Sequence, residues 1–301
     1  MKNNNTHNYC GFLNVLKPPG MSSAQVVGKV RYWLGGAKVG HAGTLDPEAS
    51  GVLPLMIGKA TRLFDYMQEK EKAYVGEIAF GASTDTQDAQ GNVLLVSDNY
   101  PDGQSVQQAL SHFQGEIWQT PPMVSALKKD GKPLYALARE GKTVDIEPRQ
   151  VWVHDLCYLG EMPVHGHRFL VRCSKGFYVR TLCEDVGALV DCPAHLRFLL
   201  RIQSGVFNLA NAHTLATIEQ ANEQGTVQKL ILPPETALAY MPQVEVPERL
   251  RFAVLHGLPL RWREFAYTGD IVSHFCLFLD GKLHAIAKKD GDTVKIKTWL
   301  G

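Results

Sequence analysis

One carboxylate stands out in a stretch that otherwise consists mostly of small and apolar residues. Asp46 lies between Leu45 and Pro47, inside the glycine-rich segment 40–51. Proline donates no backbone hydrogen bond and favours an extended conformation in the residue before it, and glycines let a backbone approach a ligand closely. Asp46 is therefore a candidate nucleophile or base on a loop. The alternative is a structural Asp-Pro turn, because this dipeptide commonly begins turns.

Two other side chains have the chemistry to complete such a site. Tyr74 begins a predicted strand over 74–80, and Arg180 is predicted at a junction between a strand and a helix. An aromatic ring can stack on a planar substrate, and a guanidinium can hold a carboxylate ionised and oriented. Each residue alone is as readily a core aromatic or a surface ion-pair partner. Only their combination with Asp46 indicates catalysis.

Motifs of several common enzyme classes are missing. Residues 51–61 resemble a phosphate-binding loop, but the glycine spacing is wrong and Ala60 interrupts the required Lys-Ser/Thr pair. His165 and His167 have no partners at a spacing useful for a metal. We also find no G-x-S-x-G elbow and no G-x-G-x-x-G after a strand. The sequence therefore predicts neither a metal nor a nucleotide cofactor.

Composition predicts an ordinary globular protein. The 301 residues are 45% hydrophobic and 20% charged, and roughly 150 residues per domain would give two domains. The 31 basic and 30 acidic residues neither indicate nor exclude nucleic-acid binding, because that requires only one basic face. The sequence contains no uninterrupted apolar run of 18 residues, so we expect no membrane span. Its polar start lacks the apolar stretch of a signal peptide. The six cysteines form no C-x-x-C pair and are predicted to be reduced thiols.

Predicted strands and helices surround the candidate residues. Ser105 and Gln108 resemble a capping box for a helix that continues to Phe113, and Thr181 and Glu184 resemble another. Before the second box, residues 177–180 are predicted to continue a strand, with Tyr178 and Arg180 on one face. Nearer Asp46 we expect a strand over 11–16, a helix capped by Ser22 or Ser23 and ended by 35–36, a strand over 52–57 and a helix over 58–67.

Charge and proline content indicate how the rest of the chain is organised. Residues 128–142 are rich in lysine and arginine and predict an exposed basic arm. Four prolines between 233 and 247 predict a linker with a boundary near 245. The remainder shows short strands and turn signals, typical of a small all-β module.

Nine ordered blocks of sequence carry a family resemblance. They are GFLNVLKPPGMSS (11–23), GHAGTLDPEASGVLP (40–54), GKAT (58–61), KAY (72–74), GASTDTQDAQG (81–91), QTPPMVSALK (119–128), GKPLY (131–135), CSKGFYVRT (173–181) and AHLRFLLR (194–201). In these blocks the chain resembles the bacterial TruB family, the tRNA pseudouridine-55 synthases. Val124 departs from the aromatic residue common there, Thr44 and Ser50 are small exchanges, and the chain after 245 matches poorly.

The resemblance implies an α+β fold with a mixed, mainly antiparallel sheet flanked by helices and loops. It divides the chain into a disordered tail, a pseudouridine synthase catalytic domain and a small β-rich, PUA-like RNA-binding module. The expected limits are 1–10 for the tail, 11–245 for the catalytic domain, 123–149 for a basic RNA-clamping insertion within it, and 246–301 for the module.

The resemblance also implies a reaction. A uridine in the T-loop of tRNA, at position 55, is isomerised: the bond from N1 to C1′ breaks and C5 bonds to C1′. No atom is added and no redox change occurs, so no cofactor or metal is expected. Asp46 would be the catalytic aspartate, and whether it attacks C1′, attacks C6 or removes a proton stays open. Tyr74 would stack on the flipped base with its hydroxyl placed for proton transfer, and Arg180 would pair with Asp46.

Further residues match the family's substrate contacts. The resemblance places His41, Tyr178 and Leu199 around the flipped base and its loop, and makes Lys17 a phosphate or loop contact. Lys128, Lys129 and Lys132 of the arm would bind the RNA backbone. The expected partner is the T-arm of tRNA, with no membrane and no obligatory protein partner, for a cytoplasmic monomer.

Two other functions are compatible with parts of the sequence. The chain could be an RNA-binding or tRNA-folding module that kept the fold without catalysis, although the retained Asp46, Tyr74 and Arg180 argue against this. It could also be an unrelated hydrolase that uses Asp46 as a covalent nucleophile on a phosphate ester. The second alternative lacks another carboxylate or metal cluster in the same loop.

Overall fold

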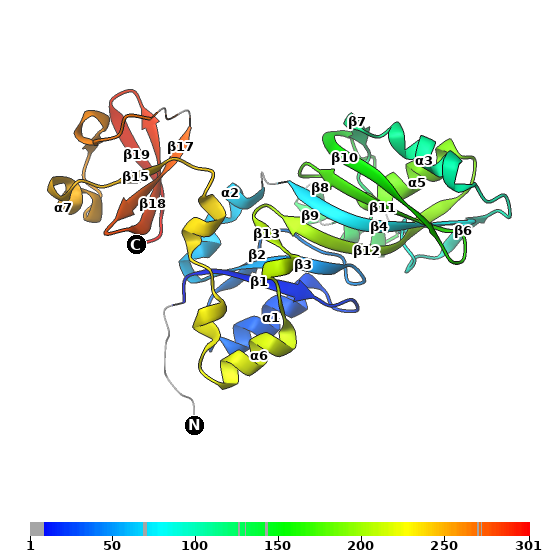
Figure 1. Cartoon of the computed structure of the whole chain (residues 1–301), viewed down its shortest axis with the longest axis horizontal. Helices are drawn as coiled ribbons and strands as arrows, with labels where there is room; N and C mark the ends of the chain where they lie inside the picture. Colours follow the sequence, from blue (N-terminus) through cyan, green and yellow to red (C-terminus); the bar gives the residue numbers. More distant parts are fainter. Residues whose placement is uncertain are drawn as a thin grey trace.

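A ten-stranded mixed sheet forms the body of the molecule (Figure 1). The computed structural model describes residues 9–68, 71–125, 127–129, 131–141, 144–269, 271 and 273–301. In spatial order the strands are β14 (His213–Thr214), β1 (Gly11–Lys17), β3 (Ser50–Ile57), β12 (Ala194–Ser204), β4 (Lys72–Phe80), β11 (Gly166–Cys173), β10 (Arg149–Met162) and β7 (Gly115–Gln119), with β13 (Phe207–Asn208) beside β12 and β2 (Val39–His41) beside β3. Only β1 with β14 and β3 with β12 pair in parallel. This confirms the expected fold class.

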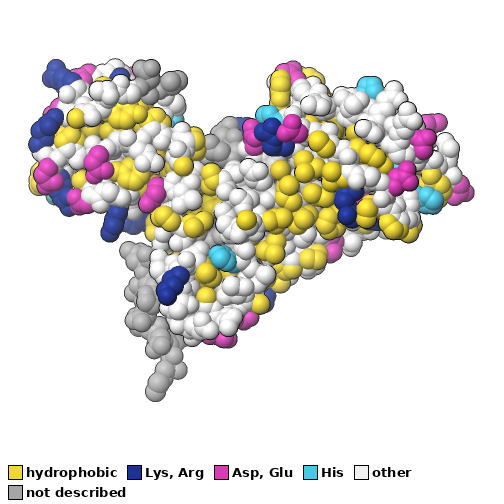
Figure 2. Space-filling view, viewed as in Figure 1, with side chains coloured by type: hydrophobic (Ala, Val, Ile, Leu, Met, Phe, Trp, Pro, Cys, Tyr) yellow, Lys and Arg dark blue, Asp and Glu magenta, His cyan; other side chains and the backbone are white. Residues whose placement is uncertain are grey.

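One face of this sheet carries the main core. Tyr74, Ile78 and Phe80 of β4 share that face, as their spacing predicted, and pack in one cluster with α3 (Gly103–Ser111) and α5 (Val179–Leu189). Figure 2 shows hydrophobic side chains gathered over β4, β11 and β12 on the face in view, with few charges among them. Phe198 of β12 is one of the exposed large hydrophobic side chains.

The helices begin where local caps allow, with two departures from expectation. Of the two predicted caps, Ser22 is the one that caps α1 (Ser23–Trp33), and it forms a full capping box with Gln25 that was not predicted. The predicted cap at Ser105 is wrong: α3 begins earlier because Asp102 accepts from the backbone N–H of Ser105 at 2.8 Å. The predicted strand over 177–180 is also wrong, since α5 already starts at Val179 and places Arg180 in its first turn.

The segment after β3, which was predicted as one helix over 58–67, forms two short helices instead. They are a 3₁₀ helix, η1 (Gly58–Leu63), followed by α2 (Phe64–Gln68). The remaining helices of the body include α6 (Leu215–Glu223), which lies beside α1 below β1 in Figure 1. No helix in the described part of the chain is long and apolar enough to cross a membrane. All six cysteines are free thiols, and four of them are buried.

A second sheet of five strands forms the C-terminal part. Its order is β15 (Gln243–Glu245), β17 (His274–Leu279), β18 (Lys282–Asp290), β19 (Thr293–Trp299) and β16 (Leu260–Arg261). The sheet takes its first strand from before the expected boundary, because Val244 is buried in its core. Phe278 and Leu300 share a second cluster with Phe12 and Leu63 of the body. The two parts therefore pack on each other through apolar side chains.

The N-terminal tail was expected to be disordered over 1–10. Residues 1–8 lie outside the described part of the chain. Tyr9 and Cys10 are half-buried, and Cys10 packs against the cluster that joins the two sheets. The expected tail therefore extends two residues too far.

Candidate active site

A cleft of about 1070 Å³ opens between the loop of Asp46 and the start of α5. Strands β4 and β12 supply its floor through Tyr74 and Leu199, and His41 and Tyr178 also line it. Asp46 faces this cleft from its loop, and Arg180 faces it from the first turn of α5. All the residues predicted for catalysis and base binding therefore meet in one place, with the exception of Lys17.

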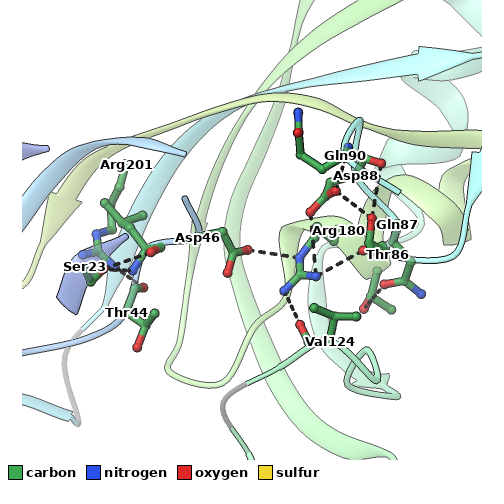
Figure 3. Close-up of polar contacts among 12 residues, drawn as sticks. Ser23, Thr44, Asp46, Thr86, Gln87, Asp88, Gln90, Val124, Arg180 and Arg201 are labelled. Atoms are coloured by element: carbon green, nitrogen blue, oxygen red, sulfur yellow. Dashed lines mark hydrogen bonds and ion pairs between the residues drawn. The ribbon is translucent and has the colours of Figure 1, made fainter. Parts of the chain in front are cut away.

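The ion pair predicted between Asp46 and Arg180 is formed. Arg180 Nε lies 3.1 Å from Asp46 Oδ2 (Figure 3). The side chain of Arg180 is only 6% exposed, whereas that of Asp46 is 42% exposed and open to the cleft. A buried, planar guanidinium that donates to a half-exposed carboxylate fixes the direction of that carboxylate while leaving it accessible to a substrate.

Arg180 is itself held by backbone carbonyls. Its Nη1 donates to Thr86 O at 3.1 Å, and its Nη2 donates to Val124 O at 2.9 Å. These acceptors come from two different segments, so the guanidinium plane is fixed on three sides. Only the carbonyl of Val124 is used, which explains why a departure from the family's aromatic residue at this position does not disturb the ion pair.

A second carboxylate near Arg180 was not predicted. Asp88 Oδ2 lies 3.9 Å from Arg180 Nη1, and Asp88 Oδ1 accepts from Thr86 Oγ1 at 2.7 Å and from Gln90 N at 3.0 Å (Figure 3). The block 81–91 was recognised in the sequence without a role. The two aspartates at 85 and 88 were the only sign in the sequence that this block could place a carboxylate near the site. The contact with Arg180 depends on the tertiary fold, which brings this turn close to it.

Buried polar side chains hold the loop of Asp46 from below. Ser23 Oγ accepts from Leu45 N and donates to Leu45 O, both at 2.9 Å. Arg201 donates to Gly43 O at 3.1 Å and to Thr44 O at 3.2 Å. The backbone before Asp46 is thus fixed in advance of substrate binding, which is what a preorganised catalytic group requires. Sequence reasoning gave Arg201 no role and considered Ser23 only as a helix cap.

Lys17, predicted as a phosphate or loop contact, does not line the cleft. The side chain is fully buried, and its ammonium donates to Pro18 O at 2.9 Å, Met21 O at 2.5 Å and Pro47 O at 2.8 Å. An ammonium has three donors, and all three are occupied. Burial lowers the pKa of Lys17 to about 8. Lys17 therefore ties the turn after β1 to the residue that follows Asp46.

We expect Lys17→Met to lower stability without changing how the protein binds RNA. Three buried carbonyls would lose their donor, at about 1 kcal/mol each, so urea denaturation should show a loss of about 3 kcal/mol. The salt dependence of tRNA affinity should equal that of the wild type. Lys29→Met, at an exposed position of α1, is the matched control. A salt slope reduced by about one unit would instead restore Lys17 as a phosphate contact.

Tyr74 is neutral at ordinary pH. Its side chain is buried, and burial raises its pKa to about 12 although Arg201 opposes the shift. Arg201 is its direct partner across β4 and β12, so both side chains stand on the same face. A hydroxyl that keeps its proton can both donate and accept a hydrogen bond beside a substrate.

Tyr178 and His41, which also line the cleft, are neutral groups as well. Burial raises the pKa of Tyr178, and burial together with the charge of Arg201 lowers the pKa of His41. His41 is therefore an uncharged ring at pH 7. Its buried Nδ1 has no hydrogen-bond partner among the described residues.

The predicted basic arm leaves the body after β7 and forms one wall of the cleft. It contains β8 (Lys128–Lys129), β9 (Lys132–Pro133) and α4 (Leu134–Arg139), and Leu127 and Gly141 line the cleft. Lys132 is exposed. The side chains of Lys128 and Lys129, by contrast, lie outside the described part of the structure.

Comparison with known families agrees with this site. A model described as TruB family pseudouridylate synthase (N terminal domain) matches residues 17–179, more than half of the chain. The chain belongs to the TruB family. A second model, the tRNA pseudouridylate synthase B C-terminal domain, matches residues 180–239. The ion pair therefore joins the two matched regions, with Asp46 in the first and Arg180 at the start of the second.

Curated TruB relatives are similar over most of their length. The tRNA pseudouridine synthase B of Symbiobacterium thermophilum is 48% identical over 253 residues, which is 82% of each chain. That of Geobacillus thermodenitrificans is 42% identical and covers 86% of this chain and 88% of its own.

Solved structures extend the similarity to the fold. The chain in the crystal structure of a Cbf5-Nop10-Gar1 complex is 27% identical, with a TM-score of 0.73 over 97% of this chain and 85% of that one. The chain in a structure of an H/ACA RNP bound to a substrate RNA containing 2′-deoxyuridine is 24% identical, with a TM-score of 0.75 over 98% of this chain and 86% of that one. The second match shows a shared fold only.

Proposed function

We propose that this protein converts the uridine at position 55 in the T-loop of tRNA to pseudouridine, with Asp46 as the essential carboxylate. The observation that carries the proposal is the ion pair of Asp46 and Arg180 in a cleft floored by Tyr74. The curated relatives of 42–48% identity are tRNA pseudouridine synthases B, and this supports the same substrate for the chain. At about 1070 Å³, the cleft has room for a flipped nucleotide.

The reaction follows from what these groups can supply. A base inside a folded RNA loop must leave the stack before its glycosidic bond can be reached. The bond from N1 to C1′ then breaks, C5 bonds to C1′, C5 loses its proton and N1 gains one. Atoms and electrons balance within the uridine, so the proposal assigns no role to a cofactor. Asp46 acts as nucleophile or as base, and Arg180 holds its carboxylate in a fixed direction in either role.

The remaining lining residues would hold the base and its loop. Tyr74 offers a buried aromatic platform with a protonated hydroxyl, as stacking and proton transfer both require. Tyr178 and Leu199 would enclose the flipped base, and His41 would contact the RNA loop from which the base is flipped. We also propose that the protein acts as a monomer in the cytoplasm without a protein partner.

Neutralising the arm should weaken tRNA binding and flatten its salt dependence. In a variant with Lys128, Lys129 and Lys132 all changed to glutamine, the slope of log affinity against log salt should fall by about 0.7 to 0.9 for every phosphate that the arm no longer neutralises. Filter binding between about 50 and 300 mM salt, a range over which phosphate contacts change affinity strongly, measures this slope. A variant with three exposed lysines outside the arm and the C-terminal module changed to glutamine (Lys29, Lys38 and Lys229) tests whether the effect is specific to the arm. An unchanged slope in the arm variant would place the RNA backbone elsewhere.

The experiment that tests the function uses unmodified tRNA transcript, purified protein and a chelator, with no added cofactor. Carbodiimide labelling and primer extension then map pseudouridine. We expect one stop, at the T-loop uridine. Tight binding without a stop would favour a non-catalytic RNA-binding module. Neither binding nor a stop, together with hydrolysis of a generic phosphate ester, would favour a hydrolase.

A further inference from the structure

The helix that carries the catalytic arginine begins without a cap of its own. Helix α5 starts after Tyr178, and no side chain of the helix or of Tyr178 accepts from its first turn in the described structure. The other described helices of nine or more residues, α1, α3 and α6, are capped by Ser22, Asp102 and Thr214. The predicted capping box at Thr181 and Glu184 is not used. Something outside the helix must therefore fix where α5 begins.

Gln119 supplies the missing contact from the end of β7. Its side chain is 1% exposed. Its Oε1 accepts from Tyr178 N at 2.9 Å, and its Nε2 donates to Tyr178 O at 3.2 Å. The same carbonyl accepts the first helical bond, from Leu182 N at 3.2 Å. One carboxamide thus holds both backbone polar groups of the residue that stands two positions before Arg180.

The segment that follows Gln119 touches the same helix start twice more. Thr181 Oγ1 donates to Thr120 O at 3.4 Å, and Arg180 Nη2 donates to Val124 O at 2.9 Å. Residues 119–125 lead directly into the basic arm. The root of the arm and the first turn of α5 are therefore joined by hydrogen bonds at Tyr178, Arg180 and Thr181.

We propose that Gln119 is a positioning residue for the reaction, and that it couples the root of the RNA-binding arm to the pair of Arg180 and Asp46. The inference rests on the proposed function. Gln119 touches no substrate; it acts by setting the start of α5 and hence the place of the Arg180 guanidinium. The guanidinium must meet Asp46, Thr86 and Val124 together, so a shift of about 1 Å at the helix start would break at least one of these contacts.

Gln119→Leu tests this role. It keeps a similar volume but removes both hydrogen bonds to Tyr178. We expect the single-turnover rate of pseudouridine formation to fall by about tenfold to a hundredfold, with tRNA affinity within about threefold of the wild type. Gln119→Glu keeps an acceptor for Tyr178 N and should recover part of the rate. Gln150→Leu, an exposed glutamine on β10, should leave the rate unchanged. A rate for Gln119→Leu equal to that of the wild type would overturn the proposal.

A double-mutant cycle separates positioning from general damage. If Gln119 acts through Arg180, Gln119→Leu should cost much less in an Arg180→Lys background than in the wild type. Equal reductions in rate in both backgrounds would overturn the proposal.

A signal that does not need turnover makes the two proposals separable. The Nε proton of Arg180, observed through its ¹⁵N resonance, should exchange slowly with water in the wild type and rapidly in Gln119→Leu. If Gln119→Leu folds poorly, the comparison is made with Gln119→Glu, which should be intermediate. A wild type that shows this protected signal but forms no pseudouridine would refute the function and retain the coupling. A signal unchanged in both variants would refute the coupling.

Discussion

Replacing Asp46 by alanine is expected to abolish pseudouridine formation while tRNA affinity stays within roughly tenfold of the wild type, about 1.4 kcal/mol. The carboxylate of Asp46 is held in place by Arg180 and is 42% exposed in the cleft. Its removal takes away the nucleophile or base but leaves the arm and the cleft walls that bind RNA. Release of tritium from tRNA labelled at C5 of uridine measures turnover, because C5 loses its proton in the reaction.

Asp46→Asn sharpens this prediction. Asparagine keeps the shape and can still accept from Arg180 Nε, yet it carries no charge and is a poor nucleophile and base. It should be as inactive as the alanine variant and should bind tRNA more nearly like the wild type. Asp65→Ala, at an exposed aspartate on α2, is the matched control and should remain active. Substantial turnover by Asp46→Asn would remove Asp46 from the chemistry.

Asp46, Tyr74 and Arg180 could be singled out from sequence because they lie in the blocks that resemble the TruB family, whereas each residue alone is as readily structural. Asp46 sits in a short, unusual loop, and Tyr74 lies on a strand with clear alternation. Arg180 was found although its local structure was predicted wrongly. The capping box at Thr181 predicted a later helix start. The helix begins at Val179 instead, where Gln119, 59 residues before Tyr178 in the chain, accepts a hydrogen bond from the backbone of Tyr178.

The residues that hold the site were not predictable in the same way. The resemblance made Lys17 a phosphate or loop contact, and a lysine at a turn gives no sign of burial in the sequence. Its partner Pro47 is 30 residues away, and the contact of Arg201 with Thr44 spans 157 residues. Asp88 reaches Arg180 only because a turn folds back over the start of α5. The role of a buried polar side chain depends on its hydrogen-bond partners, and the tertiary fold decides which partners lie within reach.

Arg180→Lys should reduce turnover by roughly 10²- to 10³-fold, the scale seen when one donor is removed from a preorganised site. Lysine keeps the charge but replaces a rigid fork by a single ammonium on a flexible stem. It cannot reach Asp46, Thr86 O and Val124 O from one position, as the guanidinium does. The carboxylate of Asp46 would remain, but its direction would no longer be fixed, so the reduction should fall on the rate rather than on tRNA affinity.

The contrast with Arg180→Met shows what the charge itself contributes. Methionine leaves the carbonyls of Thr86 and Val124 without their donor and the carboxylates of Asp46 and Asp88 without a cation, and unsatisfied acceptors in a buried position are destabilising. We therefore expect Arg180→Met to lose both turnover and thermal stability, whereas Arg180→Lys loses mainly turnover. Arg149→Lys, at an exposed position of β10 near the cleft, should retain activity within a few-fold. If Arg180→Lys turned over tRNA at the wild-type rate, charge alone would suffice and the fixed geometry of the guanidinium would have no catalytic role.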